Sequence, residues 1–434
     1  MEQRDPSDGA GATARSKVPA RLDRLPWSSF HTKLVIALGA SWVLDGIEIT
    51  LASAIGPQLE SSVTLGLTAA QVGLAASIYL FGEVIGALVF GRLSDRFGRK
   101  RLFLITLGLY LLASGLTALS FNLISFLILR FFAGAGIGGE YAAINSAIDE
   151  LIPARDRGRV DLAVNGTYWL GAIIGSLGSS LMLNPDLFGA DLGWRLAFLV
   201  GPIIALCILP LRRSLPESPR WLLTHGRVAE AERTVDSIEA TITAKGVELP
   251  PVPDSAVVTV PINRRVLYRD VARTMLHTYP RRTAVGMVLG VSQSFLYNAI
   301  FFSYTLILTH FYGVPIDVAP RYLFIFAAGN LLGPLLLGRF FDTIGRRPMI
   351  CATYATSGVI LFITGWLFKE GELTAATQTA LWSVVFFIAS AAASSAYLTV
   401  SEVFPAGMRA ETIAVFFAVC SWSVGSPRRS SSAP

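Results

Sequence analysis

The chain has 434 residues, of which 53% are hydrophobic and only 15% are charged, and its formal net charge is +6. Soluble domains usually carry about 25% charged residues, so this chain cannot cover a globular surface with polar groups. Lipid must be the solvent for much of it, and the basic excess then belongs on loops beside the membrane rather than on a nucleic-acid-binding surface. The three cysteines lie in apolar runs and indicate neither a disulfide framework nor a metal site.

The first 30 residues are polar and contain no signal-peptide core, which predicts a disordered cytoplasmic tail over residues 1–30. Apolar runs follow, each about 20 residues long, which is the length of a helix that spans a bilayer. They lie at residues 32–56, 69–91, 102–120, 122–145, 159–183, 194–211, 283–309, 319–338, 348–368 and 377–400. These ten runs predict an all-α membrane protein, and an eleventh span begins near Ala410.

The loops between these runs alternate in charge. Arg and Lys gather in the loops at 92–101, 154–159, 212–282 and 339–347. Almost none occur in the loops at 57–68, 184–193, 310–318 and 369–376. Basic loops stay on the cytoplasmic side of a membrane, so we expect a multi-pass protein of the cell (inner) membrane with a cytoplasmic N-terminus.

Two charged patterns each occur twice. The stretch Gly91-Arg92-Leu93-Ser94-Asp95-Arg96-Phe97-Gly98-Arg99-Lys100 recurs at residues 338–347 with five of ten positions identical. The pattern Glu-x-x-Pro-x-x-x-Arg, which begins at Glu150, recurs from Glu402. Their nearly equal offsets indicate an internal duplication. We therefore expect a six-helix bundle over 31–211, a linker over 212–282 and a second bundle over 283–425.

The linker contains apolar residues at helical spacing, Val228, Ala231, Val235 and Ile238, before several prolines interrupt the pattern. A second short helix is expected around residues 266–275. These features favour a cytoplasmic helical connector without chemistry of its own.

Beyond Gly425 the apolar pattern stops, and residues 426–434 are a basic tail. A duplicated protein should continue with a twelfth apolar span here. We therefore expect an incomplete second bundle of a truncated or frame-shifted chain.

Ionisable groups at membrane depth are costly, so each is a candidate functional residue. Asp45 and Glu48 lie three residues apart in the first run, on nearly one helix face, and Arg130 in the fourth run can balance both. A carboxylate that faces a movable cation can take up and release a proton. Asp45, Glu48 and Arg130 are thus the candidates for proton coupling, and a static ion pair that fixes helix packing is the alternative. Glu83 in the second run fits either interpretation equally well.

The repeated charged stretches predict a gate at the cytoplasmic mouth, because basic loops alone would not need glycine and aspartate at fixed spacing twice. Small residues around Gly134 to Gly139 let helices approach closely and place Glu140 nearer this gate than a substrate site. The candidate gate residues are Gly91, Asp95, Gly98, Arg99, Glu140, Glu150, Arg157, Gly338, Asp342, Arg346, Glu402 and Arg409.

These motifs together resemble the major facilitator superfamily, whose loop signature residues 91–100 and 338–347 match. The segments 216–223, 130–138, 193–195 and 402–405 resemble its sugar-porter branch. Asp45 to Glu48 is similar to the Asp-Gly-x-Asp element of proton-coupled aromatic-acid symporters, which implies a transport role for both acids. The resemblance implies two six-helix bundles around a central site and transport by rocking of the two halves.

Polar and aromatic residues on the inward faces are the expected substrate contacts. One glutamine of the sugar-porter pattern is replaced by Ser292, which removes a hydrogen-bonding contact to sugar. The candidates are Asn165, Tyr168, Trp169, Gln293, Asn298, Tyr304, Asn330, Trp382 and Tyr397.

The resulting expectation is a monomeric secondary transporter, a proton-coupled symporter of a small organic metabolite, either an organic acid or a sugar. A uniporter, an exporter and a transport-defective truncated member are the alternatives within the fold. A membrane sensor is disfavoured, because nothing in the sequence resembles an attached signalling domain. No Ser-His-Asp set, metal cluster or phosphate loop points to an enzyme or a cofactor.

Overall fold

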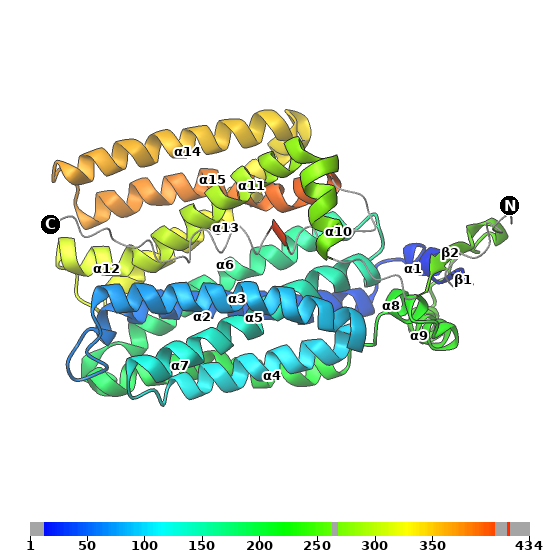
Figure 1. Cartoon of the computed structure of the whole chain (residues 1–434), viewed down its shortest axis with the longest axis horizontal. Coiled ribbons are helices and arrows are strands. Elements are labelled where there is room, and N and C mark those ends of the chain that lie inside the picture. Colours follow the sequence, from blue (N-terminus) through cyan, green and yellow to red (C-terminus); the bar gives the residue numbers. More distant parts are fainter. Residues whose placement is uncertain (1–12, 263–267, 404–414, 417–434) are drawn as a thin grey trace, which may run out of the picture.

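The computed structural model describes residues 13–262, 268–403 and 415–416 (Figure 1). Its long helices are α2 (Ser29–Leu59), α3 (Ala69–Phe97), α4 (Arg99–Thr117), α5 (Leu123–Leu151), α6 (Arg157–Met182), α7 (Pro185–Arg213), α11 (Pro280–Ser294), α12 (Ile300–Tyr312), α13 (Ala319–Thr343), α14 (Arg346–Lys369) and α15 (Ala375–Val403). The predicted all-α architecture is confirmed, because helices cover all ten apolar runs. The eleventh span near Ala410 and the tail at 426–434 lie outside the described residues.

The long helices form two bundles that lie side by side (Figure 1). In the first, α3 packs against α5, α2 against α6, and α4 between α5 and α7. In the second, α13 and α14 pack against α15. Apolar side chains on nearly every face suit these helices to lipid, where each backbone polar group must be satisfied within its own helix.

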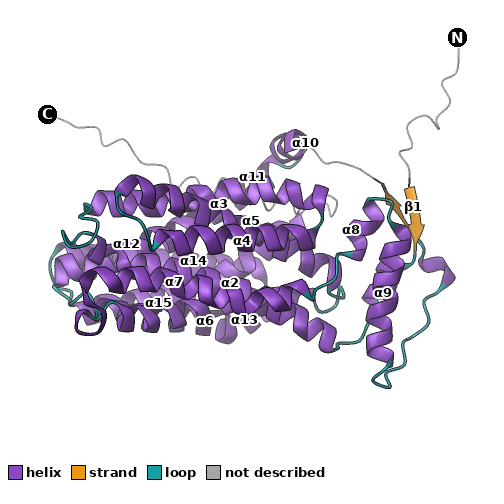
Figure 2. Cartoon of the chain, turned by 90° about the horizontal axis from the view of Figure 1, so that it is seen from below, coloured by secondary structure: helices purple, strands orange, loops and turns teal. Residues whose placement is uncertain are grey.

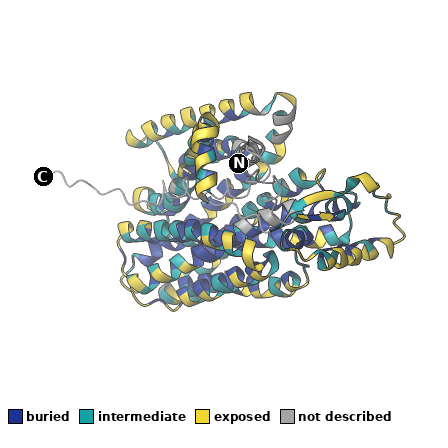
Figure 3. Cartoon of the chain, turned by 45° about the vertical axis from the view of Figure 1, so that its right-hand side comes forward, coloured by how far each residue is buried: buried dark blue, intermediate teal, exposed yellow. Residues whose placement is uncertain are grey.

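Many residues on the outward faces of the bundles are exposed (Figure 3). They include large apolar residues. On α14, Phe362 is 80% exposed and Trp366 is 59% exposed. Contiguous apolar surface of this kind is rare on soluble monomers and is what a lipid-facing helix presents. Eight helices of the described part of the chain are long and apolar enough to cross a membrane.

The two bundles are joined near the end that lies farthest from α8 and α9, here called the far end. Ser53 of α2 donates a hydrogen bond of 2.5 Å to the carbonyl oxygen of Phe301. Ser180 of α6 donates one of 2.8 Å to the carbonyl oxygen of Asp317, and His310 approaches Glu60 to within 2.9 Å. These contacts hold the bundles together on the far side of the bundle centre.

The opposite end carries a small subdomain, here called the linker subdomain (Figure 2). Its elements are β1 (Thr13–Ser16), α1 (Val18–Asp23), α8 (Pro219–Thr224), α9 (Val228–Thr243), η2 (Asp254–Ala256) and β2 (Val258–Pro261). Strand β1 pairs antiparallel with β2, with Thr13 opposite Pro261 and Ser16 opposite Val258. The short helix α10 (Tyr268–Arg273) and the π turn η3 (Thr274–Thr278) lead from it into α11.

The expectation of a disordered tail over residues 1–30 is wrong from residue 13 onward. Val18, Leu22 and Leu25 are buried against α8 and α9 in one hydrophobic core. The predicted apolar face of α9 supplies the other side of that core through Ala231, Val235 and Ile238. The polar composition of the segment hid three apolar residues at near-helical spacing.

Ion pairs reinforce this contact between the N-terminal segment and α9. Arg21 and Arg24 each approach the Glu239 carboxylate to 2.6 Å, and Lys17 lies 2.5 Å from Asp254. Burial works to raise the pKa of Glu239, but the hydrogen bonds from Arg21 and Arg24 outweigh it, so its pKa lies below the usual range. Glu239 therefore stays ionised and bound to α1.

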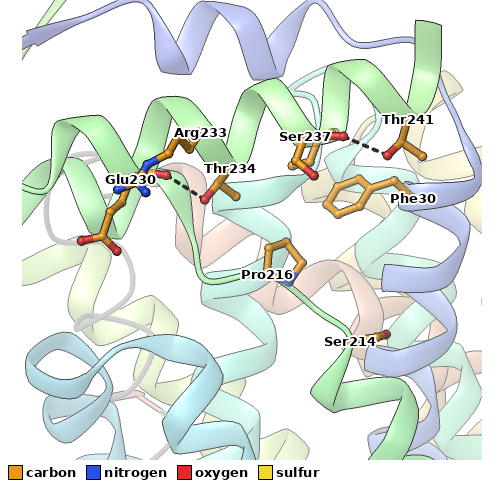
Figure 4. A pocket seen from close by; sticks show the side chains of 9 residues that line it. Phe30, Ser214, Pro216, Glu230, Arg233, Thr234, Ser237 and Thr241 are labelled. Atoms are coloured by element: carbon orange, nitrogen blue, oxygen red, sulfur yellow. Dashed lines mark hydrogen bonds between the residues drawn. The ribbon is translucent and has the colours of Figure 1, made fainter. Parts of the chain in front are cut away.

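A cavity of about 490 Å³ separates α9 from the bundle below it (Figure 4). Phe30 of α2 and the chain at Ser214 and Pro216 form one wall, and Thr234, Ser237 and Thr241 of α9 form the other. The linker subdomain thus meets the bundle through α8 and the chain before it, not along the whole of α9.

Removing the shared acceptor tests the N-terminal contact. We expect Glu239→Gln to raise the hydrogen-exchange rate of the α1 amides about fivefold, since a partly exposed ion pair is worth about 1 kcal/mol. In the native chain the contact is present above the unfolded-state pKa of glutamate, about 4.3, and weakens as pH falls through the lower folded-state pKa. Glu232→Gln, at an exposed position of the same helix, is the control. Equal exchange in both variants would contradict the assignment.

Candidate functional site

A buried ion pair lies at the centre of the first bundle. Arg130 of α5 is 1% exposed and Glu48 of α2 is fully buried, and the Nη1 group of Arg130 donates to Oε1 of Glu48. The other oxygen of Glu48 accepts hydrogen bonds from Ser114 at 2.9 Å and Tyr110 at 3.1 Å. The carboxylate is thus held by α4 and α5 at the same time.

Asp45 does not share this cation. Its Oδ1 accepts a hydrogen bond of 3.4 Å from the hydroxyl of Tyr79, whose ring centroid lies 4.2 Å from the Arg130 guanidinium carbon. The expectation that Arg130 balances both acids is corrected: Arg130 pairs with Glu48, and Tyr79 lies between the pair and Asp45. Nothing in the sequence distinguished Tyr79 from the other aromatic residues of its apolar run.

A narrow cavity opens beside Asp45, between α2, α3 and α5. Asp45, Glu83 and Glu140 all line it, together with Trp42 and Tyr141. Glu140 accepts two hydrogen bonds of 2.8 Å from the guanidinium of Arg212 at the end of α7, and both residues are buried. Glu140 thus forms a pair of its own rather than joining the Arg99 cluster, and its role in the gate stays a prediction. Arg212 was missed because a basic residue at the end of a span is ordinary.

Two glycines of α5 set the position of Tyr79 and Glu83. A Cβ atom at Gly134 would lie 2.1 Å from the backbone oxygen of Tyr79, and one at Gly138 would lie 1.9 Å from that of Glu83. Small residues at these positions allow the backbones of α3 and α5 to touch. The close approach brings both side chains to the same level as Asp45.

The cavity region is rich in aromatic side chains from both bundles. Trp42 meets Tyr168 of α6 edge to face at 6.3 Å between ring centroids, and Tyr168 meets Trp169 at 4.9 Å. Trp169 reaches across to Tyr297 of the second bundle at 5.7 Å. Asn165 lies half-buried one turn away and donates to Asp161 at 3.1 Å.

Asn298 and Gln293 lie at an irregular point of the seventh span. Helices α11 and α12 are joined by a π turn, η4 (Phe295–Ala299), which includes Tyr297 and Asn298, and both residues are half-buried. Single π turns frequently occur at functional sites because they release a backbone group and redirect side chains. The apolar pattern of the sequence predicted a continuous helix here.

Tyr304 and Asn330 lie in the packed core of the second bundle, and their contact with substrate stays a prediction. Tyr304 is fully buried, its ring stacks on Phe326 at 5.7 Å, and its hydroxyl is bonded to Thr379. Asn330 is fully buried and its amide donates to the Phe326 carbonyl oxygen at 3.0 Å. Trp382 packs on Tyr304 at 5.3 Å, and the side chain of Tyr397 lies outside the described residues.

The first charged stretch forms a compact cluster around Arg99 at the linker end. Arg99 donates to Asp95 at 2.5 Å and to Glu150 at 3.0 Å. The backbone amides of Arg99 and Lys100 donate to Glu217, at 2.8 and 3.2 Å, so a linker carboxylate caps the N-terminus of α4. The structure thus brings Asp95, Arg99 and Glu150 together, and it adds Glu217.

Other predicted gate residues lie elsewhere. Arg157 bonds to the Ile152 carbonyl oxygen at 3.0 Å and to Asp23 at 3.5 Å, not to Glu150. Gly91 lies inside α3. The side chains of Asp342, Arg346 and Glu402, as well as Gly338, are outside the described part, as is Arg409.

The duplication is visible in the backbone at the turn between paired helices. Gly98 has φ 98° and ψ 153°, and Gly345 has φ 104° and ψ 150°. Residues with a Cβ atom rarely adopt this conformation, which explains glycine at both positions.

Comparisons with known proteins identify the family. A sequence model described as sugar (and other) transporter matches residues 43–425. The chain belongs to this family. The crystal structure of a D-xylose-proton symporter superposes with a TM-score of 0.70 at 22% identity and covers 92% of this chain and 88% of that one. The fold is therefore the major facilitator fold of a multi-pass membrane protein, and the matched proteins are transporters rather than enzymes.

Two curated relatives with 31–33% identity match over shorter stretches. The niacin transporter of Acinetobacter baylyi is 33% identical over 220 residues, which cover 51% of this chain and 48% of the relative. Organic cation/carnitine transporter 7 of Arabidopsis thaliana is 31% identical over 229 residues, 53% of this chain and 44% of the relative. The match thus spans about half the length of these two curated relatives.

The close packing of α3 on α5 can be tested by adding one methyl group. We expect Gly138→Ala to lower the free energy of unfolding by about 1–3 kcal/mol, because the new Cβ would collide with the backbone at Glu83. Thermal unfolding of the purified protein measures this. Gly108→Ala is the matched control, since a Cβ there meets nothing within 4 Å. Similar melting of the two variants would argue against the close contact.

Proposed function

We propose that the protein is a proton-coupled symporter of a small organic metabolite that works by alternating access. The observation that carries this proposal is the fully buried Glu48–Arg130 pair. Buried ion pairs contribute little net stability, so a pair retained in the centre of a helix bundle favours a functional role. Tyr79 links this pair to Asp45, which lines the narrow cavity, and this link supports coupling between proton and substrate.

The proposed proton step uses groups already in contact. With Arg130 close, Glu48 is held as a carboxylate by the guanidinium and by Ser114 and Tyr110. When α5 moves relative to α2, Glu48 loses its cation and takes up a proton to remain neutral in a site of low polarity. Return of Arg130 releases that proton. Opening to opposite sides before and after this exchange would move one proton per cycle.

The proposed orientation places the linker subdomain in the cytoplasm of a cell with the protein in its inner membrane. The basic loops at this end support that side. The far-end contacts between α2 and α12, such as Ser53 to Phe301, would then close the external side. We also propose that the protein acts as a monomer, with residues 31–211 and 283–425 as its two moving bundles and 212–282 as their linker.

The sequence predicts an organic acid or a sugar as the substrate. The described contacts argue against the organic acid. Arg130, the cation nearest the central acids, is already bound to Glu48, so an anion would lack a free positive partner. The relatives named for niacin and for organic cations support a small nitrogenous metabolite as the cargo. Sugars stay a second candidate class of substrate, because the description of the family names them.

Coupling can be measured in proteoliposomes. A pH difference of one unit supplies about 1.4 kcal/mol per proton, which is about tenfold accumulation. We expect Glu48→Gln to lose this accumulation and to keep exchange of substrate across the membrane, because the amide cannot release a proton. Glu232→Gln should accumulate substrate as the native chain does. Accumulation unchanged in Glu48→Gln would contradict proton coupling there, and accumulation absent from the native chain would favour a uniporter.

The Arg99 cluster can be tested separately as a gate. We expect Asp95→Asn to slow transport up to about fivefold with little change in substrate affinity, since it weakens a half-exposed ion pair worth about 1 kcal/mol or less. Initial uptake rates and equilibrium binding separate the two effects. Asp186→Asn, an exposed acid at the far end, is the control. A large loss of affinity with normal turnover would place Asp95 in the binding site instead.

A further inference from the structure

Another cavity lies at the linker end of the first bundle, between the turn from α3 to α4 and the helices α8 and α9. Its volume is about 390 Å³, which is within the range of about 300–1,000 Å³ that small-molecule sites occupy. The bundle contributes Arg96, Phe97, Lys100 and Arg101 to its lining, and the linker subdomain forms the opposite wall.

Both acids that line this cavity already have partners. Glu217 accepts hydrogen bonds from the backbone amides of Arg99 and Lys100, at 2.8 and 3.2 Å, and is therefore turned toward the N-terminus of α4. Glu230 approaches Arg227 to 2.5 Å, and the Nε group of Arg227 donates to its other oxygen at 2.8 Å. Neither carboxylate forms an ion pair with the basic residues of the bundle wall.

The basic residues of the bundle wall have no such partners. In the described part of the chain, no carboxylate lies within ion-pair distance of Arg96, Lys100 or Arg101. Arg96 lies over the ring of Phe97 at 5.2 Å from its centroid, a contact that leaves the charge of the guanidinium uncompensated. Three positive charges thus meet at one cavity, and guanidinium and ammonium groups together fit an anion with several oxygen acceptors, such as a phosphate.

The opposite wall is fixed to the bundle. The indole Nε1 of Trp221 in α8 donates a hydrogen bond of 2.8 Å to the carbonyl oxygen of Asp95, and Trp221 is buried. The guanidinium of Arg227 lies over the same indole at 5.9 Å from the ring centroid. An anion between these walls would contact α4 and the linker subdomain at once.

The outward face of α4 favours a lipid as the source of the phosphate. Arg101 is exposed, and it shares a helix face with Ile105 and Leu112, which are 54% and 63% exposed. Leu112 lies about 16 Å farther along the helix, and the hydrocarbon of one leaflet is about 15 Å thick. Arg101 therefore lies at headgroup level when this face meets acyl chains, and Phe97, 45% exposed, gives the cavity an apolar edge.

We propose that this cavity binds the phosphate of an anionic phospholipid, with Arg96, Lys100 and Arg101 around its oxygens and the acyl chains along Ile105 and Leu112. The bound lipid holds the linker subdomain against the first bundle. Anionic lipids of the cytoplasmic leaflet attract such basic clusters, which agrees with the proposed orientation. The inference goes beyond the transport cycle and needs no proton coupling.

Native mass spectrometry of the purified full chain tests the site, because it separates chains that carry one lipid from chains that carry none. The protein is equilibrated in detergent micelles that hold equal amounts of phosphatidylglycerol and phosphatidylcholine with the same acyl chains. We expect phosphatidylglycerol to bind in preference. Arg101→Gln should lower this preference about fivefold, which is the contribution of one basic residue near a membrane surface. Excess inorganic phosphate at constant ionic strength should not displace the lipid, because phosphate alone lacks the contacts with α4.

Two variants are matched controls. Arg101→Lys keeps the charge and should keep the preference, and Arg159→Gln removes an exposed positive charge at the same end of the bundle but outside the cavity. An equal loss in Arg101→Gln and Arg159→Gln, or equal binding of the two lipids to the native chain, overturns the proposal. Displacement by inorganic phosphate overturns the lipid assignment and leaves a soluble phosphate compound as the ligand. The measurement involves no transport, so its result is independent of the accumulation test on Glu48.

Discussion

The burial of charge in an apolar bundle is the constraint on which the site depends. Glu48 and Arg130 lie in the bundle centre as a pair, and Ser114 and Tyr110 donate to the second oxygen of Glu48. A displacement of α5 relative to α2 separates the two charges. A proton or another ion must then neutralise the buried carboxylate. In the proposed mechanism, helix packing and protonation of Glu48 are therefore one equilibrium.

Close helix contact makes this equilibrium sensitive to small movements. The backbones of α3 and α5 touch at Gly134 and Gly138, so Tyr79 and Glu83 move with the helix that carries Arg130. Densely packed interfaces change between discrete arrangements rather than deforming gradually. Tyr79, Glu83 and Arg130 therefore belong to one mechanical unit formed by α3 and α5, which faces Asp45 and Glu48 of α2.

The sequence predicted the fold well because membrane spans and duplicated motifs are local signals. All ten apolar runs are helical, and Arg130 and Glu48 meet as their burial required. The pairing of Glu140 with Arg212 was not predictable, because it depends on where α7 ends against α2 and α5. The core positions of Tyr304 and Asn330 depend on helix rotation, which hydrophobicity on all faces leaves undetermined. The N-terminal segment was misjudged because composition was read over 30 residues while three apolar residues decided its packing.

The pairing of strand β1 with strand β2 joins the segment before the first bundle to the end of the linker. Residues 13–16 hold residues 258–261, and Asp23 bonds to both Arg157 and Arg220, so most of the linker moves with the N-terminal bundle. The chain that connects this anchored part to the second bundle is then the stretch from Ile262 to Tyr279, far shorter than the linker itself. The length of that connection, rather than of the whole linker, limits how far the two bundles can rotate apart at this end.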